Sequence, residues 1–326
     1  MKVLVTGGAG YIGSQTCKSL AASGHEPIVY DNLSGGYEWA VKWGPLERGD
    51  ILDRAGLESV LEAPRPDAVL HFAALINVGE SVTDPAKYYR TNLVGTLTLL
   101  DAIRAHGIRK LVFSSTCATY GDPVTLPLAE DHPQAPINPY GHSKLMIEQL
   151  LKDYAAAYGL GSVSLRYFNA AGADPDGELG EEHDPETHLI PLVLQAAAGS
   201  RSHITVFGRD HPTADGTCVR DYIHVSDLAA AHVLALTAIE GPGARAFNLG
   251  TGQGYSVQEI IDAARLVTNR PIGVEHGPRR AGDPPTLIAD ARAARRELGW
   301  QPQHSSLNEI LKTAWSWLEK QRNTHR

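Results

Sequence analysis

Short apolar runs alternate with longer amphipathic stretches along most of this chain. The apolar runs have the length and composition of strands, and they cover residues 2–7, 26–32, 68–74, 110–116, 163–169 and 246–252. Helical patterns separate the first five runs, near residues 12–22, 53–63, 88–106 and 142–158. Nearly all-apolar strands that alternate with helices are typical of a parallel sheet covered on both faces. The pattern therefore predicts an α/β fold with a doubly wound parallel sheet of the Rossmann type.

The pattern changes after Asn169. Residues 170–188 are rich in glycine, proline and acids, which favours a long loop. Ser256 and Glu259 have the spacing of a capping box, which predicts that another helix starts there. We therefore expect two closely packed domains. The first comprises residues 1–169 and 216–252, and the second, a smaller mixed α/β domain, comprises residues 170–215 and 253–326.

Composition and charge narrow the class of protein. Hydrophobic residues make up 43% and charged residues 20% of the 326 positions, as in globular proteins, and the net charge of −8 argues against broad nucleic-acid binding. No apolar run reaches the roughly 18 residues of a membrane span, and a strand-like start argues against a secretory signal. The three cysteines, Cys17, Cys117 and Cys218, lie far apart. Their spacing predicts neither a metal site nor a disulfide framework, and we expect a cytoplasmic protein without a metal.

A glycine-rich loop follows the first predicted strand. Gly8, Gly10 and Gly13 have G-x-G-x-x-G spacing, and Gly7, Gly10 and Gly13 also fit a G-x-x-G-x-x-G spacing. Such a loop, placed between a strand and a helix, lets the backbone approach a pyrophosphate, whose negative charge the helix N-terminus favours. Glycines also mark plain turns, but this context favours a dinucleotide site.

Asp31 ends the second predicted strand, 18 residues after Gly13. A carboxylate there accepts hydrogen bonds from the adenosine ribose and repels a 2′-phosphate, so we predict NAD rather than NADP. Further candidates lie where ligands collect in parallel sheets, at and beyond the ends of strands, although each of them fits a packing role equally well. They are Asp50, Ile51, Phe72, Ala73 and Ala74.

A hydroxyl and a Tyr-x-x-x-Lys sequence form the candidate catalytic site. Thr116 ends a predicted strand 24 residues before Tyr140, and Tyr140 and Lys144 share one helix face. An unperturbed tyrosine has a pKa of about 10. Opposite charges ~4 Å apart interact by roughly 4 kcal/mol at an effective dielectric constant of about 20. We therefore expect Lys144 and an oxidised nicotinamide to lower the Tyr140 pKa. Tyr140 then becomes a base for a substrate hydroxyl, with Thr116 sharing the proton.

These motifs together resemble those of the extended short-chain dehydrogenase/reductase family. The similarity spans nearly the whole chain and is carried by LVTGGAGYIGS, VYDNLS, NPYGHSKLMIEQ, LRYFNAAGADPDGELGE, DGTCVRDYIHVSDLA and RRAGDP. The chain is most similar to members that epimerise UDP-glucose and UDP-galactose at C4. The resemblance implies tightly bound NAD in the first domain and a UDP-sugar in the second. It also implies transient oxidation at C4, rotation of a 4-keto intermediate and return of the hydride.

The resemblance also implies roles for individual residues. Tyr140 would be the catalytic base and acid, Lys144 its electrostatic partner and Thr116 the hydroxyl helper. The cofactor side gains Tyr11, Ile12, Asn32, Asn92, Ser114 and Tyr167, besides Tyr140 and Lys144. On the substrate side, Asn169, Arg220 and Arg280 would hold the diphosphate, Phe207 would lie near uracil and Asp283 at the uridine ribose, with His188, Leu189 and Leu287 around the sugar. A homodimer through the helices near 88–106 and 142–158 is implied as well.

Three positions depart from the family pattern. Ile76 stands where many relatives have a lysine, His188 where an asparagine is common, and Leu287 where some relatives have a tyrosine. UDP-pentoses (UDP-xylose and UDP-arabinose) and UDP-N-acetylhexosamines therefore stay open as substrates.

Among the alternative functions, a 4,6-dehydratase would need an acidic pair where Cys117 and Ala118 stand. A net oxidoreductase would exchange its NADH, and a non-catalytic NAD-sensing module would not need the complete Tyr-Lys-Thr set.

Overall fold

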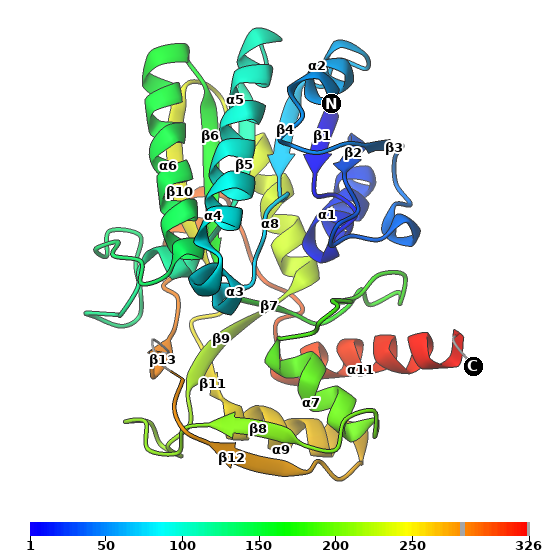
Figure 1. Cartoon of the computed structure of the whole chain (residues 1–326), viewed down its shortest axis with the longest axis vertical. Helices are drawn as coiled ribbons and strands as arrows, with labels where there is room; N and C mark the ends of the chain where they lie inside the picture. Colours follow the sequence, from blue (N-terminus) through cyan, green and yellow to red (C-terminus); the bar gives the residue numbers. More distant parts are fainter. Residues whose placement is uncertain (281–283, 325–326) are drawn as a thin grey trace.

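The computed structural model describes residues 1–280 and 284–324. Its largest element is a seven-stranded parallel sheet with the order β10-β6-β5-β4-β1-β2-β3, in the upper part of Figure 1. The strands are β1 (Lys2–Thr6), β2 (Glu26–Asp31), β3 (Leu46–Arg48), β4 (Ala68–His71), β5 (Lys110–Thr116), β6 (Gly161–Tyr167) and β10 (Gly243–Leu249). The strand order reverses between β1 and β4, and at such a point the carboxyl ends of the strands form a ligand crevice.

Helices cover both faces of this sheet, as the apolar strands require. Val3 and Val5 of β1 belong to one apolar cluster and Leu4 to another, because successive strand residues point to opposite faces. The first cluster includes residues of α1 (Tyr11–Ala22) and α8 (Val225–Thr237). The second includes residues of α2 (Arg54–Glu62), α5 (Gly95–Ala105) and α6 (Pro139–Tyr158). The predicted doubly wound fold is confirmed.

A smaller unit lies below the large sheet in Figure 1. It contains the sheet β11-β9-β13, in which β7 also pairs with β9, and the two-stranded sheet β12-β8. These strands are β7 (Asn169–Ala171), β8 (Ile204–Phe207), β9 (Val219–His224), β11 (Gly254–Ser256), β12 (Val274–Gly277) and β13 (Thr286–Leu287). Besides α8, the helices after β7 are α7 (Leu189–Ala197), α9 (Val257–Thr268), α10 (Arg292–Glu297) and α11 (Leu307–Thr324). Apolar residues of α7, α9 and α11 share one core.

The sequence located most of these elements, with small errors at their ends. The six predicted strands are present, and the capping box at Ser256 and Glu259 starts α9 as predicted. Strand β3 was missed, since three residues give too short a pattern. The predicted helix near 88–106 is broken into α4 (Pro85–Tyr88), a π-helix η2 (Tyr89–Val94) and α5. No helix in the described ranges is long and apolar enough to cross a membrane.

Shorter helical segments complete the chain. They are η1 (Glu38–Ala40), α3 (Val78–Thr83) and η3 (Cys117–Thr119).

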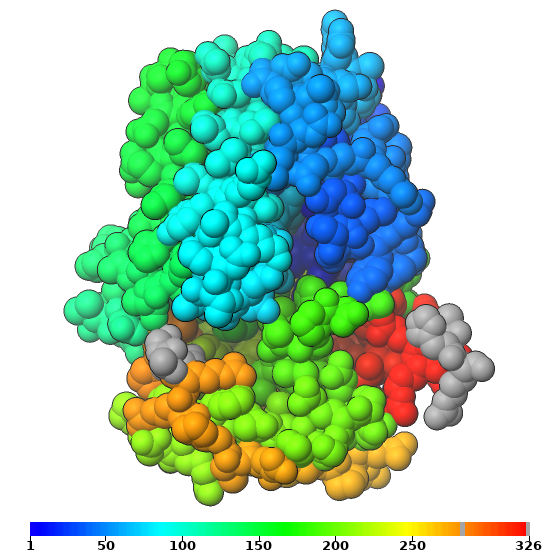
Figure 2. Space-filling view, in the orientation of Figure 1, coloured from blue at the N-terminus to red at the C-terminus, as the bar shows by residue number. Residues whose placement is uncertain are grey.

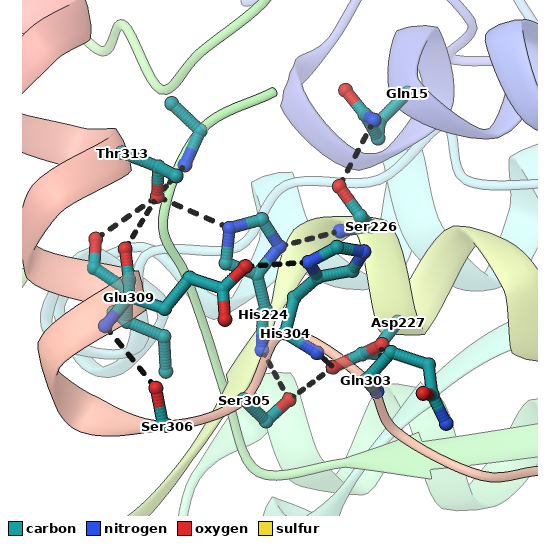
Figure 3. A network of polar contacts seen from close by, with 12 residues as sticks. Gln15, His224, Ser226, Asp227, Gln303, His304, Ser305, Ser306, Glu309 and Thr313 are labelled. Carbon is teal, nitrogen blue, oxygen red and sulfur yellow. Dashed lines mark hydrogen bonds and ion pairs between the residues drawn. The ribbon is translucent and has the colours of Figure 1, made fainter. Parts of the chain in front are cut away.

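A polar network joins residues 303–305, just before α11, to α8, and joins α8 to α1 (Figure 3). Asp227, in the first turn of α8, accepts hydrogen bonds from two backbone N–H groups and one hydroxyl within residues 303–305. Ser226 accepts a hydrogen bond from the side-chain amide of Gln15 in α1 (3.2 Å). The Asp227 carboxylate and the Ser226 hydroxyl thus both have donors, as buried polar groups require. The network holds the start of α11 against α8 and fixes the smaller unit beneath the large sheet.

Candidate active site

The glycine loop is shaped by close contacts with its own chain. A Cβ atom at Gly7 would lie 2.5 Å from the backbone nitrogen of Ala73, and one at Gly13 would lie 2.2 Å from the Gly7 carbonyl oxygen. At Gly10 the nearest atom would be 3.4 Å away. Gly10 is also the N-cap of α1, and no side chain caps the helix there. Gly7 and Gly13 therefore fold the loop, while Gly10 leaves the α1 N-terminus open to an anion, which fits a dinucleotide pyrophosphate.

Asp31 ties the end of β2 to this loop. Its carboxylate accepts hydrogen bonds from the N–H groups of Ala9 (3.0 Å) and Leu33 (2.8 Å). Burial raises the pKa of Asp31, and these two hydrogen bonds lower it in part. Each carboxylate oxygen keeps a further lone pair for a ribose hydroxyl. Nearby, the Asn32 amide donates to the Asp50 carboxylate (2.9 Å), so the two predicted adenosine-side residues lie side by side.

The segment after β4 is fixed by a single buried amide. Asn92, on the π-helix η2, accepts from the Leu75 N–H (2.8 Å) and donates to the Leu75 carbonyl oxygen (3.0 Å) and to the Ser143 hydroxyl (3.2 Å). Ala73 donates its N–H to the Thr6 carbonyl oxygen (3.0 Å), which keeps the segment against the glycine loop. The π-helix thus turns Asn92 inward, a use typical of π-bulges at functional sites.

The remaining predicted cofactor-side residues take several positions. Tyr11 donates its hydroxyl to the Gly172 carbonyl oxygen (2.6 Å), and Ile12 packs against the core cluster that includes Val5. Ile51 is buried, and a Cβ atom at Gly95 would lie 2.6 Å from its Cδ1 atom. The positions with partly buried side chains in the segment after β4 are Phe72, Ala73 and Ala74. Ile76, which departs from the family pattern, is 46% exposed.

Tyr140 and Lys144 meet Thr116 where the start of α6 crosses the end of β5. Asn138 caps α6 by accepting from the Gly141 N–H (2.8 Å), and this places Tyr140 in the first turn. The Tyr140 hydroxyl is hydrogen-bonded to the Thr116 side chain. The Lys144 ammonium nitrogen donates to the Ser114 carbonyl oxygen (2.8 Å) and lies 5.9 Å from the Tyr140 ring centroid. The three predicted catalytic residues therefore converge.

The Ser114 side chain extends this group. Its hydroxyl is hydrogen-bonded to the hydroxyl of Tyr167, at the end of β6. Two predicted cofactor-side residues on neighbouring strands therefore lie beside the Tyr140 site.

The expected lowering of the Tyr140 pKa is wrong for the protein chain alone. Burial raises the Tyr140 pKa to about 12, although the hydrogen bond with Thr116 lowers it in part. Burial also lowers the Lys144 pKa to about 7, because a charged ammonium is costly in this enclosed site. The cost of burying the two groups outweighs the attraction between their charges, and the spacing in the sequence shows only the attraction. Ionising Tyr140 therefore needs further positive charge in the site.

The small sheet brings three predicted substrate residues under this group. Asn169 of β7 donates its amide to the Asp221 carbonyl oxygen (3.1 Å), and Leu287 of β13 pairs in register with Arg220 of β9. Burial raises the pKa of Cys117 to about 12, and the Arg220 guanidinium lowers it in part. Arg220 therefore lies close enough to act on the residue next to Thr116.

Other predicted substrate residues lie farther along the small unit. The Arg280 guanidinium lies over the Phe207 ring, 4.0 Å from its centroid. His188 is the N-cap of α7, and Leu189 is the first residue of that helix. Asp283 lies outside the described residues. Figure 2 shows the surface hollowed between the cyan segment that includes α3 and α4 and the blue N-terminal segment, above the green residues.

Sequence reasoning missed the buried ion pair that supports α6. Arg166 of β6 donates to the Glu148 carboxylate (2.5 and 2.9 Å), and Ser115 of β5 donates to it as well (2.6 Å). Both charged side chains are less than 5% exposed. The pair holds the helix that carries Tyr140 against β5 and β6. No local spacing indicates it, because the partners lie 18 residues apart and meet only in the folded sheet.

Comparisons with known proteins agree with this architecture. The sequence profile of the "NAD dependent epimerase/dehydratase family" matches residues 3–250. A UDP-glucose 4-epimerase of Rhizobium meliloti (strain 1021) is 58% identical over 316 residues, which cover 97% of this chain and 96% of that one. The crystal structure of UDP-glucose 4-epimerase from Brucella ovis in complex with NAD has a TM-score of 0.94 at 56% identity and 97% coverage of both chains.

A third relative bears on the sugar. The crystal structure of UDP-glucose-4-epimerase from Stenotrophomonas maltophila, with bound NAD and formylated UDP-arabinopyranose, has a TM-score of 0.96. It is 42% identical to this chain and covers 99% of both chains.

Proposed function

The chain belongs to the NAD dependent epimerase/dehydratase family, and from this premise we propose that it is an NAD-dependent isomerase that interconverts UDP-glucose and UDP-galactose. The observation that carries the proposal is the meeting of Tyr140, Thr116 and Lys144 at the carboxyl end of β5, between the glycine loop and the small sheet. The likeness to UDP-glucose 4-epimerases over nearly the whole chain supports it.

The proton chemistry belongs to Tyr140. The glycine loop would hold NAD, which would supply the acceptor and donor of the C4 hydride. Tyr140 removes the proton from the 4-hydroxyl and returns a proton after the sugar has turned over. Thr116, already hydrogen-bonded to Tyr140, shares this proton or orients the hydroxyl. The Tyr140 pKa is raised to about 12 in the chain alone, so Tyr140 needs nearby positive charge to ionise. The oxidised nicotinamide and protonated Lys144 would supply this charge and favour the phenolate.

The small unit holds the UDP group in this proposal. Arg220 and Arg280 donate to the diphosphate, for which a planar guanidinium is well suited, and Asn169 adds an amide on the same side. Phe207 offers its ring to uracil, and the Arg280 guanidinium that lies over this ring leaves it when the nucleotide enters. We assign the uridine ribose to Asp283. Binding energy from UDP, remote from C4, holds the sugar while it rotates.

The two predicted domains bind different ligands in this proposal. We propose that residues 1–169 and 216–252 bind NAD, and that residues 170–215 and 253–326 bind the UDP-sugar. The glycine loop and Asp31 in the first set support this, as do Phe207 and Arg280 in the second. Asn169 and Arg220 belong to the first set, but they lie on β7 and β9, which pair in the small sheet. A cytoplasmic location is supported by Cys17 and Cys117, whose buried side chains form no disulfide within the described residues.

A second candidate is a 4-epimerase of UDP-pentoses or UDP-N-acetylhexosamines. Leu287 of β13 pairs beside Arg220, so we propose that it borders the sugar, and a leucine there leaves more room than a tyrosine. The Stenotrophomonas maltophila structure, which holds a formylated UDP-arabinopyranose, also favours a tolerant sugar site. A dehydratase is disfavoured, because the buried Cys117 and Ala118 supply no carboxylic acid after Thr116.

One experiment ranks these functions. Purified enzyme is incubated separately with UDP-galactose, UDP-N-acetylgalactosamine and UDP-xylose, and the products are separated and identified. We expect the 4-epimer of UDP-galactose to form fastest, without net consumption of added NAD. Release of NADH would identify a net oxidoreductase, and no 4-epimer from any of the three substrates would reject the function.

We also propose a homodimer. Val94, which ends η2, and Leu97 of α5 are 48% and 38% exposed, and Met146 of α6 is 43% exposed. These two helices pack on the same face of the large sheet. Apolar side chains gathered on neighbouring helices favour burial against a second copy of the same surface.

A further inference from the structure

The loop before α7 gathers four potential metal ligands outside the machinery used above, apart from His188. They are Glu181, His183, Glu186 and His188, and we call them the loop cluster. The carboxylates of Glu181 and Glu186 are only 7% exposed, while the side chains of His183 and His188 are 20% and 44% exposed. All four come from one eight-residue stretch, so the loop itself holds them together.

We propose that the loop cluster binds one divalent transition-metal ion of the zinc type. Two imidazole nitrogens and two carboxylate oxygens are ligands that zinc accepts in tetrahedral sites. With metal–ligand bonds of about 2.0–2.1 Å, the edge of such a tetrahedron is about 3.3 Å. The Nδ1-to-carboxylate distances in the cluster are 2.9 Å twice for His188, and 3.2 and 3.5 Å for His183. These four distances bracket that edge, and the four ligand atoms all lie within 4.8 Å of one another.

The His183 Nδ1 atom lies within ion-pair distance of the same two carboxylates, at 3.2 Å from Glu181 and 3.5 Å from Glu186. This Nδ1 atom is buried, yet in the described part of the chain it makes no aligned hydrogen bond. A buried polar nitrogen without such a bond is costly. A cation bound between the two carboxylates would give this nitrogen a partner when the imidazole is neutral.

The charge of the cluster favours such a cation. Two carboxylates carry two negative charges, which one divalent ion balances while both imidazoles stay neutral. The alternative is a proton on each imidazole. Burial lowers the His188 pKa, but Glu181 and Glu186 outweigh this and raise it to about 10. Both occupants satisfy the charge, and the experiment below separates them.

A neighbouring acidic group shows the contrast. Asp174, Asp176 and Glu178 also converge, but the Lys18 ammonium nitrogen lies 2.7–2.9 Å from all three carboxylates. That group already contains its cation.

An entry path also exists. Glu181, His183 and Glu186 line a cavity of about 90 Å³, together with Gly172 and Trp317. A cavity of this kind needs only about 10–15 Å³ to hold one water molecule, so water can reach the three ligands that line it. The cavity adjoins Tyr11, whose ring is 6.4 Å from the His183 ring and whose hydroxyl donates to Gly172. An ion here would tie the loop that leads into His188 and α7 to the start of α1.

Metal binding to the full-length enzyme tests the proposal. Tag-free protein is treated with EDTA, dialysed against micromolar free Zn²⁺, and analysed for zinc by mass spectrometry and for thermal stability. We expect one zinc per chain and a higher melting temperature. Glu181→Gln and His183→Asn should each weaken zinc binding by more than about 100-fold, beyond the 10–100-fold that an outer-shell contact is worth. His203→Asn removes a surface His–Glu pair (3.3 Å) elsewhere and should keep the zinc.

The readouts do not depend on catalysis. Equal zinc content in the parent protein and in Glu181→Gln would overturn the proposal, as would no zinc in the parent protein. The loop cluster would then be a pair of protonated imidazoles held by two carboxylates. The epimerase proposal stands or falls separately, because neither Glu181 nor His183 has a role in it.

Discussion

Lys144 lies beneath Tyr140 with its ammonium nitrogen 5.9 Å from the centre of the phenol ring, and both side chains are enclosed. The pair shares one face of α6, as the four-residue spacing predicts. Enclosure, however, raises the pKa of the phenol and lowers that of the ammonium, so each group resists ionisation in the chain alone. A bound, positively charged nicotinamide would make the phenolate available, which couples proton transfer to the presence of the oxidised cofactor.

Lys144 should cost stability in the cofactor-free protein. Burial lowers the Lys144 pKa from 10.5 to about 7, so the unfolded chain binds this proton more tightly than the folded chain. This difference reduces the stability of the fold at every pH below about 10.5. Each pKa unit by which folding lowers the lysine pKa costs about 1.4 kcal/mol of stability. Replacing Lys144 removes this cost, but it also removes the hydrogen bond to Ser114, which offsets part of the gain in stability. We expect Lys144→Met to raise the free energy of unfolding by about 2 kcal/mol at pH 7, by urea denaturation. The difference in the free energy of unfolding between variant and parent should narrow toward pH 10, because the parent gains stability there. A variant that is less stable than the parent at pH 7 would contradict a destabilising, buried Lys144.

Thr116 should act through its hydrogen bond to Tyr140. Thr116→Val keeps the shape of the side chain but removes the hydroxyl that lowers the Tyr140 pKa. A hydrogen bond to a developing charge is worth about 1.5–3 kcal/mol, or roughly 10- to 100-fold in rate. We expect kcat to fall by about that factor, with the ascending, acidic limb of the pH–rate profile moved to higher pH, because the Tyr140 pKa rises. Thr116→Ser serves as the control that keeps the hydroxyl. Equal rates for the valine and serine variants would remove Thr116 from the mechanism.

His232 should make the fold sensitive to acid. Its ring is buried against Phe72, with 4.6 Å between ring centroids, and burial lowers its pKa from 6.5 to about 4. The unfolded state therefore binds an extra proton as the pH falls through 6.5, and the folded state loses about 1.4 kcal/mol per pH unit until about pH 4. Relative to the parent, His232→Leu should gain this amount per pH unit between pH 6.5 and 4.5 in urea denaturation. A stability difference that stays constant with pH would contradict the assignment of a neutral, buried imidazole.

Leu97 should lie in the proposed dimer interface. A glutamate in its place would put a charge among apolar side chains that a partner covers, which is costly to desolvate. We expect Leu97→Glu to shift the mass measured by light scattering from dimer to monomer at micromolar concentration. Leu266, 84% exposed on α9, offers the control Leu266→Glu, which should leave the dimer intact. A dimer that persists in Leu97→Glu would place the interface elsewhere.

The strands of the large sheet and their parallel, doubly wound arrangement could be predicted because β1, β2, β4, β5 and β6 are nearly all-apolar and helices separate them. The glycine loop and the Tyr140–Lys144 spacing were readable for the same reason, since each is a local pattern with a local cause.

Contacts between distant segments left no such pattern. The Asn92 amide meets the Leu75 backbone only because η2 is a π-helix, and Arg166 meets Glu148 only across the finished sheet. The pKa of Tyr140 was mispredicted because burial, which spacing cannot show, outweighs a nearby charge. The loop cluster escaped notice because its acids suggested only a solvated loop, although its two histidines were a readable signal.

The most direct test of the proposed function compares the parent enzyme with Tyr140→Phe. Conversion of UDP-galactose to UDP-glucose is followed by product analysis, and UDP binding is measured by calorimetry on the same samples. We predict that the parent forms the 4-epimer, and that Tyr140→Phe lowers kcat by about 100- to 10,000-fold while UDP binds with unchanged affinity. A parent enzyme that forms no 4-epimer, or a Tyr140→Phe variant with near-normal turnover, would contradict the account.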